Sequence, residues 1–405
     1  MFKFKFRYLD KYIMDISIIG LSLKLPNNIN NLDNLYDKLK NKIDCVSDHP
    51  IDRFDTESYY DQNNSVGKFN TKKGGYLSNV YDFDNAFFKI SNKEAKTMDP
   101  QQRILLELVY EALKDCNLDL KDVSNTNTGV FIGSCNTEYF SNQSEDPSLC
   151  NEYSINGGLL TLLSNRISYF YNLKGPSMTI DTACSSSGYA LHNARQSLIS
   201  GECNLCIVGG SNLILNPETT VGFSQGSFLS PDGQCKTFDA SANGYVRSEG
   251  CVIYILKRLP DAIKDKNKIY AIIKESNINQ DGNTNSITIP NQDQQEELLK
   301  KYYSKININD ITFIEAHGTG TKLGDKIESS SIGNVLGSNR NNKLKVGSIK
   351  SVIGHTEATA GLAAICKVIL MMKYKQFLPN LHFNTPSTDI DFEKLNIDVC
   401  SEVEK

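Results

Sequence analysis

The chain has 405 residues, and because a typical domain has about 100–200 residues, this length predicts two or three structural units or one large duplicated α/β unit. Hydrophobic residues make up 40% of the chain and charged residues 22%, which excludes a wholly disordered, collagen-like or coiled-coil protein. The net charge of −4 gives no field that attracts polyphosphate or an anionic membrane, so we expect no nucleic-acid partner.

Residues 1–14 alternate Phe with Lys or Arg and contain no uninterrupted apolar stretch, so they are not a secretory signal. We interpret them as an N-terminal extension, with a transit peptide as the alternative. The longest apolar run, Gly361 to Met372, is interrupted by Lys367 and is shorter than the about 20 residues that cross a bilayer. The 11 scattered cysteines do not form a disulfide framework. We therefore expect a cytoplasmic protein with free thiols and no membrane association.

Strand and helix patterns alternate from Asp15 onward. Short apolar runs that end in glycine are typical of buried strands, and apolar residues at three- and four-residue spacing are typical of helices. The patterns predict a strand at Ile16–Gly20, a helix at Leu32–Leu39, surface loops over residues 45–95, a long helix that begins after Asp99 and Pro100, and buried strands at Gly129–Gly133 and Cys206–Gly210.

The pattern restarts after Pro260 and a lysine-rich turn. It predicts strands at Ile269–Lys274, Thr312–Ala316 and Lys345–Ile349, and helices at Gln292–Tyr303 and Ala358–Met372. Two successive parts of similar plan suggest a duplicated fold. We therefore predict two similar α/β halves, at residues 15–262 and 263–405.

Cys184 stands at the most informative place in the first half. A β-branched strand from Ser177, a turn of small residues and a helical pattern would leave this thiol at a helix N-terminus. Lowering a cysteine pKa from about 8.5 to about 7 needs about 2 kcal/mol, and a helix N-terminus typically supplies about 0.3–1 kcal/mol. We therefore expect a nearby imidazole to supply the rest. The alternative is a small buried cysteine without a chemical role.

Two of the five histidines, His317 and His355, each follow a predicted strand and precede glycine-rich or helical sequence. The glycines after His317 allow close backbone approach. A phosphate loop is not formed there, since Lys322 is followed by Leu323 rather than Ser or Thr. Taken alone, each histidine is equally consistent with a structural role.

Together these three segments resemble the active-site motifs of the β-ketoacyl synthase family, the condensing ketosynthases of polyketide and fatty acid synthases. The resemblance extends from Asp15 to about Val399. It includes Asp99-Pro100-Gln101-Gln102-Arg103, Gly209-Gly210-Ser211-Asn212, Ser230-Pro231-Asp232-Gly233, Lys236-Thr237-Phe238-Asp239-Ala240 and Asn279-Gln280-Asp281-Gly282. It implies the thiolase fold, two similar α/β halves in a five-layer αβαβα sandwich, and usually a homodimer formed beside the Cys184 strand.

The resemblance also implies roles for individual residues. Cys184 would be the acylated nucleophile, and His317 and His355 would assist the decarboxylation of a malonyl group. Lys350 would lie beside the histidines, with Glu357 as its ionic partner. Supporting positions in the same motifs are Thr319 and Thr321.

The implied activity is that of an acyltransferase of the 3-oxoacyl-carrier-protein synthase type. Such an enzyme catalyses a decarboxylative Claisen condensation of an acyl-Cys thioester with a malonyl group. Sulfur suits this chemistry because it is both a soft nucleophile and a good leaving group. Two neutral imidazoles can stabilise the enolate. Substrates would be presented on the phosphopantetheine of an acyl carrier protein, with no metal and no directly bound cofactor.

One departure from the family pattern leads to a further expectation. Family members carry a glycine-rich stretch just after the point that corresponds to Lys405. It resembles the supplier of a second oxyanion-hole amide and of the last strands of the second half. We therefore expect a truncated product with weak or no activity. Two alternatives follow: a non-catalytic remnant or dimerisation scaffold, and, less in keeping with His355, a thiolase or chalcone-synthase relative.

Overall fold

The computed structural model of the chain describes residues 15–304, 306–338 and 340–405. The predicted extension, residues 1–14, lies outside the described residues. Within the described part of the chain, no helix has both the length and the apolar character needed to span a membrane.

The strands and helices lie as follows. The strands are β1 (Ile16–Lys24), β2 (Ser47–Asp48), β3 (Lys73–Gly74), β4 (Thr128–Gly133), β5 (Ser177–Ile180), β6 (Leu205–Asn212), β7 (Gly250–Arg258), β8 (Ala271–Ile273), β9 (Phe313–Glu315), β10 (Leu344–Gly347) and β11 (Ile397–Val399). The α-helices are α2 (Leu32–Lys40), α3 (Thr56–Tyr59), α4 (Asn92–Thr97), α5 (Pro100–Asp115), α6 (Leu120–Val123), α7 (Glu138–Ser144), α8 (Ser154–Gly158), α9 (Thr161–Tyr171), α10 (Ser186–Ile199), α11 (Glu218–Gln225), α12 (Leu259–Lys264), α13 (Gln292–Tyr303), α14 (Lys322–Ile332), α15 (Lys350–Ile353) and α16 (Ala360–Tyr374). Short 3-10 or π turns are η1 (Pro147–Leu149), η2 (Ile308–Asp310), η3 (Gly333–Gly337) and η4 (Glu357–Thr359).

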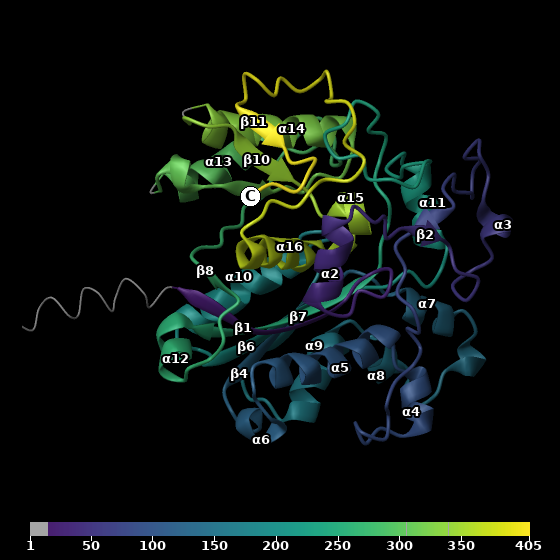
Figure 1. Cartoon of the computed structure of the whole chain (residues 1–405). Helices are drawn as coiled ribbons and strands as arrows, with labels where there is room; N and C mark the ends of the chain where they lie inside the picture. The colour runs from purple at the N-terminus through teal and green to yellow at the C-terminus, as the bar shows by residue number, and fades with distance from the viewer. Residues whose placement is uncertain (1–14, 305, 339) are drawn as a thin grey trace, which may run out of the picture.

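The elements stack in five layers (Figure 1). A six-stranded sheet in the order β5-β4-β6-β7-β1-β8 is covered on one face by α5 and α9 and on the other by α10 and α16. A three-stranded sheet in the order β11-β10-β9 lies beyond α16, and α13 and α14 cover its outer face. The two middle helices are therefore buried between two sheets.

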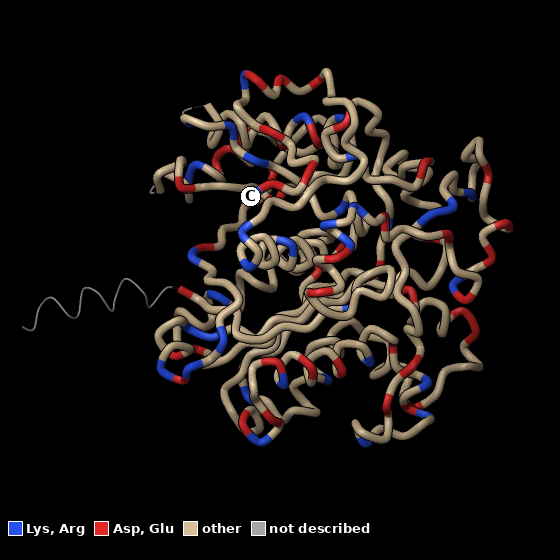
Figure 2. The backbone as a smooth tube through the Cα atoms, viewed as in Figure 1, with Lys and Arg blue, Asp and Glu red and all other residues tan. Residues whose placement is uncertain are grey.

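Side chains of the central strands alternate between two cores. In β7, Val252, Tyr254 and Leu256 face the core formed with α10 and α16, whereas Cys251, Ile253 and Ile255 face the core formed with α5. Because helices cover both faces of the sheet, consecutive residues along its central strands are apolar. Figure 2 shows acidic and basic residues interspersed around the outside, with few charges on these strands.

The predicted strands and helices are present, with small differences at their ends. Helix α13 has the predicted bounds, and the 45–95 region consists of loops with only short elements. One placement differs from the predicted plan: β8 pairs antiparallel with β1 and so belongs to the six-stranded sheet. The local pattern predicts a strand there, but the sheet that a strand joins depends on its partner, which local sequence does not encode.

Candidate active site

Cys184 lies in a tight turn between β5 and α10, immediately before Ser185, the residue that precedes the helix. Ala183 adopts a left-handed conformation with φ of 54°. Its N–H donates to Asp181 Oδ1 at 3.0 Å, and the Thr182 N–H donates to Ser186 Oγ at 2.9 Å. These bonds fix the turn, so the thiol lies at the N-terminus of α10, as predicted.

Helix α10 lies close to β4 because Gly133 has no side chain. A Cβ atom at this position would lie 2.3 Å from the backbone nitrogen of Ser187, closer than any van der Waals contact. The strand end therefore packs directly against the first turn of the helix and sets the height of Cys184 above the sheet.

His317 lies in the loop that follows β9. The loop is anchored by Glu328 of α14: its Oε1 accepts the His317 N–H at 2.6 Å and its Oε2 accepts the Gly318 N–H at 2.8 Å. Gly318 has a φ of 47°, which favours glycine. Glu328 is not among the residues predicted from the sequence. The sequence signal for Glu328 is its position three residues after Asp325, which places both carboxylates on the same face of α14. The Asp325 carboxylate accepts the Gly320 N–H of the same loop at 3.1 Å.

His355 lies in the turn between α15 and α16. Its backbone N–H donates to Val246 O at 2.8 Å. Its Nδ1 accepts the backbone N–H of Glu357 at 3.0 Å. Because Nδ1 is an acceptor in this bond, a neutral His355 carries its proton on Nε2. The ring packs edge-on to Tyr245, with ring centroids 5.1 Å apart.

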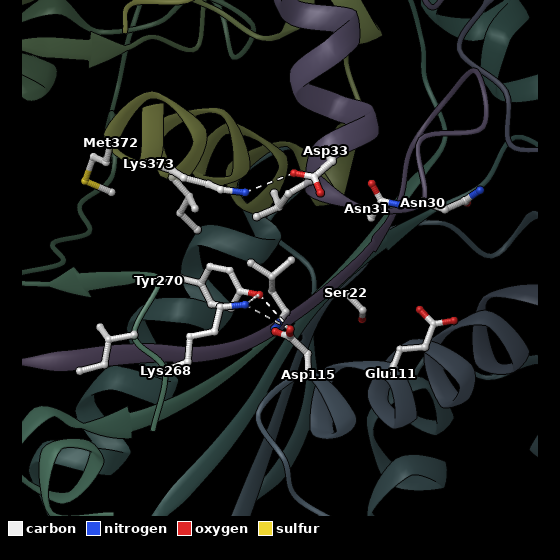
Figure 3. A pocket seen from close by; sticks show the side chains of 14 residues that line it. Ser22, Asn30, Asn31, Asp33, Glu111, Asp115, Lys268, Tyr270, Met372 and Lys373 are labelled. Carbon is white, nitrogen blue, oxygen red and sulfur yellow. Dashed lines mark hydrogen bonds and ion pairs between the residues drawn. The ribbon is translucent and has the colours of Figure 1, made fainter. Parts of the chain in front are cut away.

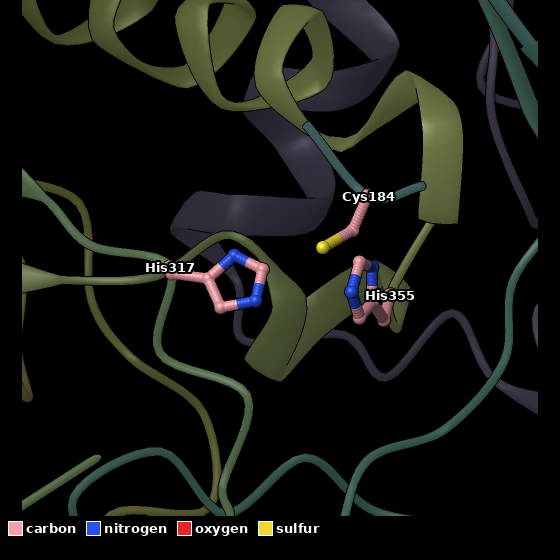
Figure 4. Close-up of side chains that lie close together, drawn as sticks. All are labelled: Cys184, His317 and His355. Atoms are coloured by element: carbon pink, nitrogen blue, oxygen red, sulfur yellow. The ribbon is translucent and has the colours of Figure 1, made fainter. Parts of the chain in front are cut away.

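The three predicted reactive side chains come together although they lie far apart in the sequence. One side-chain ligand atom each from Cys184, His317 and His355 lies within 4.8 Å of the other two. The centroids of the two imidazole rings are 5.3 Å apart, and the ring planes are inclined at 86° to each other. In Figure 4 the Sγ of Cys184 points into the space between the rings. One turn and two loops thus meet around a common space.

Both imidazoles are neutral near pH 7. Desolvation in the cavity and the positive charge of Lys350 lower the pKa of His317, although the residue as a whole keeps contact with solvent. Burial, followed by the charges of Lys350 and Arg247, lowers the pKa of His355, which is 4% exposed. Neutral imidazoles can donate or accept a proton without having to lose a charge first.

The expectation that an imidazole lowers the pKa of Cys184 was wrong. Burial raises the pKa of the thiol, and the charge that opposes this rise is the ammonium group of Lys350. Lys350 is buried, and its Nζ donates to the carbonyl oxygen of His317 at 2.7 Å. An imidazole with a lowered pKa carries no positive charge and cannot stabilise a thiolate by charge attraction.

The expected ion pair between Lys350 and Glu357 was also wrong. The Glu357 carboxylate instead binds the guanidinium of Arg247, at 2.6 and 3.1 Å. The carboxylates that act electrostatically on Lys350 are those of Glu328 and Glu315. The competing partner, Arg247, lies 110 residues away in the sequence, and a bidentate guanidinium is the stronger partner for a carboxylate.

Thr319 and Thr321 lie in the loop after His317, and their hydroxyls are 3.1 Å apart. They do not line the cavity described next. Their supporting role stays a prediction.

A cavity of about 940 Å³ opens beside Cys184, His317 and Lys350. Its walls come from α10, residues 276–281, the end of β9 and α16, and Ala364, Ile365 and Val368 supply apolar surface. Cavities that bury small ligands typically have about 300–1,000 Å³, so an acyl chain fits by volume. The polar groups at one end and the apolar wall of α16 suit a molecule with a reactive head and a hydrocarbon tail.

A second cavity, of about 570 Å³, lies between β1, α2, α5 and α16 (Figure 3). On its walls Lys373 lies 3.2 Å from Asp33, Lys268 lies 3.5 Å from Asp115, and the Tyr270 hydroxyl donates to Asp115 at 2.8 Å. The described residues that line it include neither cysteine nor histidine. The cavity beside Cys184 is therefore the candidate active site.

The charge of Lys350, which acts on Cys184, His317 and His355, opposes a divalent cation at these three side chains.

Comparison with known proteins identifies relatives along almost the whole chain. Residues 14–262 match the family model for the N-terminal domain of β-ketoacyl synthase, and residues 270–384 match that for its C-terminal domain. A reducing polyketide synthase of Gibberella moniliformis is 44% identical over 94% of this chain and 16% of its own length. A phenolphthiocerol/phthiocerol polyketide synthase of Mycobacterium tuberculosis is 40% identical over 95% of this chain and 21% of its own length.

Solved structures agree. The ketosynthase from module 6 of the bacillaene synthase of Bacillus subtilis has a TM-score of 0.88 and 39% identity, over 96% of this chain and 67% of that chain. An oxazolomycin ketosynthase domain of Streptomyces albus has a TM-score of 0.92 and 32% identity, over 96% of this chain and 68% of that chain. The predicted thiolase fold is confirmed. These matches do not favour the scaffold alternative or the thiolase and chalcone-synthase alternative.

The chain spans only about a sixth to a fifth of the length of the curated relatives named above.

Proposed function

The chain belongs to the β-ketoacyl synthase family, and from that premise we propose that it joins an acyl group held on Cys184 to a malonyl group, with loss of carbon dioxide. The observation that carries the proposal is the convergence of one thiol and two neutral imidazoles, within 4.8 Å, beside a cavity with an apolar wall.

The first step transfers an acyl group from a carrier thioester to Cys184. The sulfur attacks the thioester carbonyl, the carbon–sulfur bond to the carrier breaks, and the carrier thiol leaves with a proton. His317 accepts the proton of Cys184, because Nε2 of His355 already holds one and its Nδ1 is occupied by the Glu357 N–H. The Lys350 charge favours the thiolate while the proton moves.

The second step converts a malonyl thioester into a carbon nucleophile. Its carboxylate leaves as carbon dioxide, and the electron pair of the broken bond forms an enolate with negative charge on the thioester oxygen. The Nε2–H of His355 donates to this oxygen, and a protonated nitrogen of His317 is the second donor. Losing one such donor costs about 10²–10³-fold in rate in other enzymes.

The third step forms the product. The enolate carbon attacks the carbonyl carbon of the acyl group on Cys184, a carbon–carbon bond forms, and the bond to Cys184 breaks. The sulfur leaves as a thiolate beside Lys350 and takes up a proton from solvent, because the proton that it lost in the first step left with the carrier thiol. The product is a β-ketoacyl thioester that stays on the carrier.

The substrates are proposed to arrive on the phosphopantetheine arm of an acyl carrier protein, and the chain is proposed to act as a homodimer. Strand β5, which leads to Cys184, is one of the two edge strands of the six-stranded sheet, and Met178 on it is 39% exposed. An open strand edge favours pairing with a second copy. The molecular mass in solution tests this proposal: a monomer at micromolar concentration would contradict it.

Release of labelled carbon dioxide from a malonyl carrier protein, with an acyl carrier protein present, tests the condensation. The wild-type chain is expected to release carbon dioxide above the uncatalysed rate and to form a β-ketoacyl product. Cys184→Ala is expected to abolish the β-ketoacyl product. Cys150→Ala, a change at an exposed cysteine, should leave product formation unchanged. Equal product from wild type and Cys184→Ala would refute the proposal.

A further inference from the structure

A buried group of three charged side chains lies beside His355 and is not part of the chemistry proposed above. Arg247, Glu357 and Glu138 are 3%, 8% and 5% exposed. The Arg247 guanidinium binds Glu357 at 2.6 and 3.1 Å and approaches Glu138 at 3.4 Å. It also donates to the Thr220 hydroxyl at 2.8 Å. One cation therefore compensates two buried carboxylates, which would otherwise be very unfavourable.

The backbone of Glu357 is in a conformation that a glutamate rarely adopts. Its φ is +43°, in the left-handed region, and such a conformation persists only where surrounding contacts impose it. The bidentate bond to Arg247 is the side-chain contact that holds this residue. In the same conformation the Glu357 N–H points at Nδ1 of His355, 3.0 Å away. Glu357, the residue in the strained conformation, is thus the one whose N–H binds Nδ1 of His355.

The segment that carries Arg247 also holds the backbone of His355. The His355 N–H donates to Val246 O at 2.8 Å, and the Ser248 N–H donates to His355 O at 2.9 Å. Arg247 lies between these two contacts. The position of His355 and the position of its hydrogen-bond donor are therefore fixed by one short segment, through its backbone and through one side chain.

We propose that Arg247 is a positioning residue for His355. By holding the Glu357 carboxylate it keeps the Glu357 N–H on Nδ1, so that the proton of the imidazole stays on Nε2 and the ring keeps its orientation toward Cys184. The catalytic consequence rests on the function proposed above, in which Nε2–H donates to the enolate oxygen. The hydrogen bond itself does not depend on that function.

Nuclear magnetic resonance of the full chain tests the hydrogen bond directly. The readouts are the coupling between the Glu357 amide nitrogen and His355 Nδ1 across the hydrogen bond, and the exchange rate of the Glu357 amide proton. Arg247→Lys keeps the charge but loses the bidentate geometry. Glu357→Gln keeps the shape but loses the charge. Thr220→Val is the matched control, because it removes a different contact of the same guanidinium.

Both Arg247→Lys and Glu357→Gln are expected to lose the coupling and to exchange the amide proton of residue 357 faster, whereas Thr220→Val retains both signals. If Arg247→Lys does not fold, Glu357→Gln decides the matter alone. Persistence of the coupling in the charge-network variants, or its loss in all three variants, would overturn the inference.

A kinetic readout separates positioning from simple loss of structure. In the folded variants, the turnover number for carbon dioxide release is expected to fall by up to about 10²–10³-fold, the effect of losing one oxyanion donor, with little change in KM for the malonyl carrier. If the wild-type chain releases no carbon dioxide, the proposed function fails, while the coupling measurement still decides the role of Arg247.

Discussion

The buried ion pair between Glu315 and Lys367 connects the strand that leads to His317 with helix α16, which lines the cavity. Lys367 Nζ lies 2.8 Å from Glu315 Oε2, and the two side chains are 0% and 6% exposed. Removing one partner of a buried pair costs about 3–5 kcal/mol, because the other charge is left uncompensated. Lys367→Met is therefore expected to lower the free energy of unfolding by about 3–5 kcal/mol.

The stability lost in Lys367→Met should depend on pH and on the presence of the Glu315 carboxylate. Burial raises the pKa of Glu315, and the charge of Lys367 opposes that rise. Without Lys367 the carboxyl binds a proton more readily when folded than when unfolded. Its unfavourable contribution is therefore smallest at low pH and grows as pH rises through the folded pKa. In the double variant Glu315→Gln/Lys367→Met both charges are absent, and the amide oxygen that replaces the carboxylate can still accept the N–H of Ile349.

Urea unfolding followed by circular dichroism at pH 6 and pH 8 measures these changes. The double variant should recover most of the stability lost in Lys367→Met. Lys373→Met is the control on the same helix, since its exposed pair with Asp33 is worth less than about 1 kcal/mol. If Lys367→Met loses no more stability than this control, or if the double variant is as unstable as the single variant, the buried pair does not stabilise the fold.

Three further predictions concern the active site. Lys350→Met should raise the pKa of Cys184, so the pH midpoint of its alkylation by iodoacetamide should move upward; an unchanged midpoint would contradict this. Because the folded pKa of His355 is lowered, the unfolded state binds more protons below pH 6.5, and stability should fall by up to about 1.4 kcal/mol per pH unit on acidification. His355→Gln should remove the part of this pH dependence that His355 contributes, as measured by urea unfolding at several pH values. An unchanged pH dependence would contradict this prediction. Gly133→Ala should destabilise the fold by about 1–3 kcal/mol in the same assay, since its Cβ would lie 2.3 Å from Ser187 N, and a neutral result would show that the strand end can move.

The fold was largely predictable because its signals are local. The apolar runs of β4 and β6 end in glycine or small polar residues, and the stripe that begins after Asp99 and Pro100 matches α5. The motifs around Cys184 and the two histidines also identified the side chains that meet beside the cavity. Cys184 and His317 follow the strands β5 and β9, whereas the short helix α15 lies between β10 and His355.

The rest could not be predicted, because it depends on which distant groups face each other. The partner of Glu357 is Arg247, 110 residues away, and the strand neighbour of β8 is β1, the first strand of the described chain. The pKa of Cys184 depends on burial in the folded chain and on Lys350. No local pattern encodes these distances, so a resemblance to other proteins predicts which residues matter better than it predicts their partners.

The site of acylation shows directly whether Cys184 is the nucleophile. The full chain is incubated with an acyl phosphopantetheine thioester and digested, and mass spectrometry then locates the added acyl group among the 11 cysteines. The acyl group is expected on Cys184, and the modification is expected to fall sharply in His317→Ala, which lacks the proton acceptor. Acylation spread over several cysteines, or acylation of Cys184 that is insensitive to His317, would contradict this expectation.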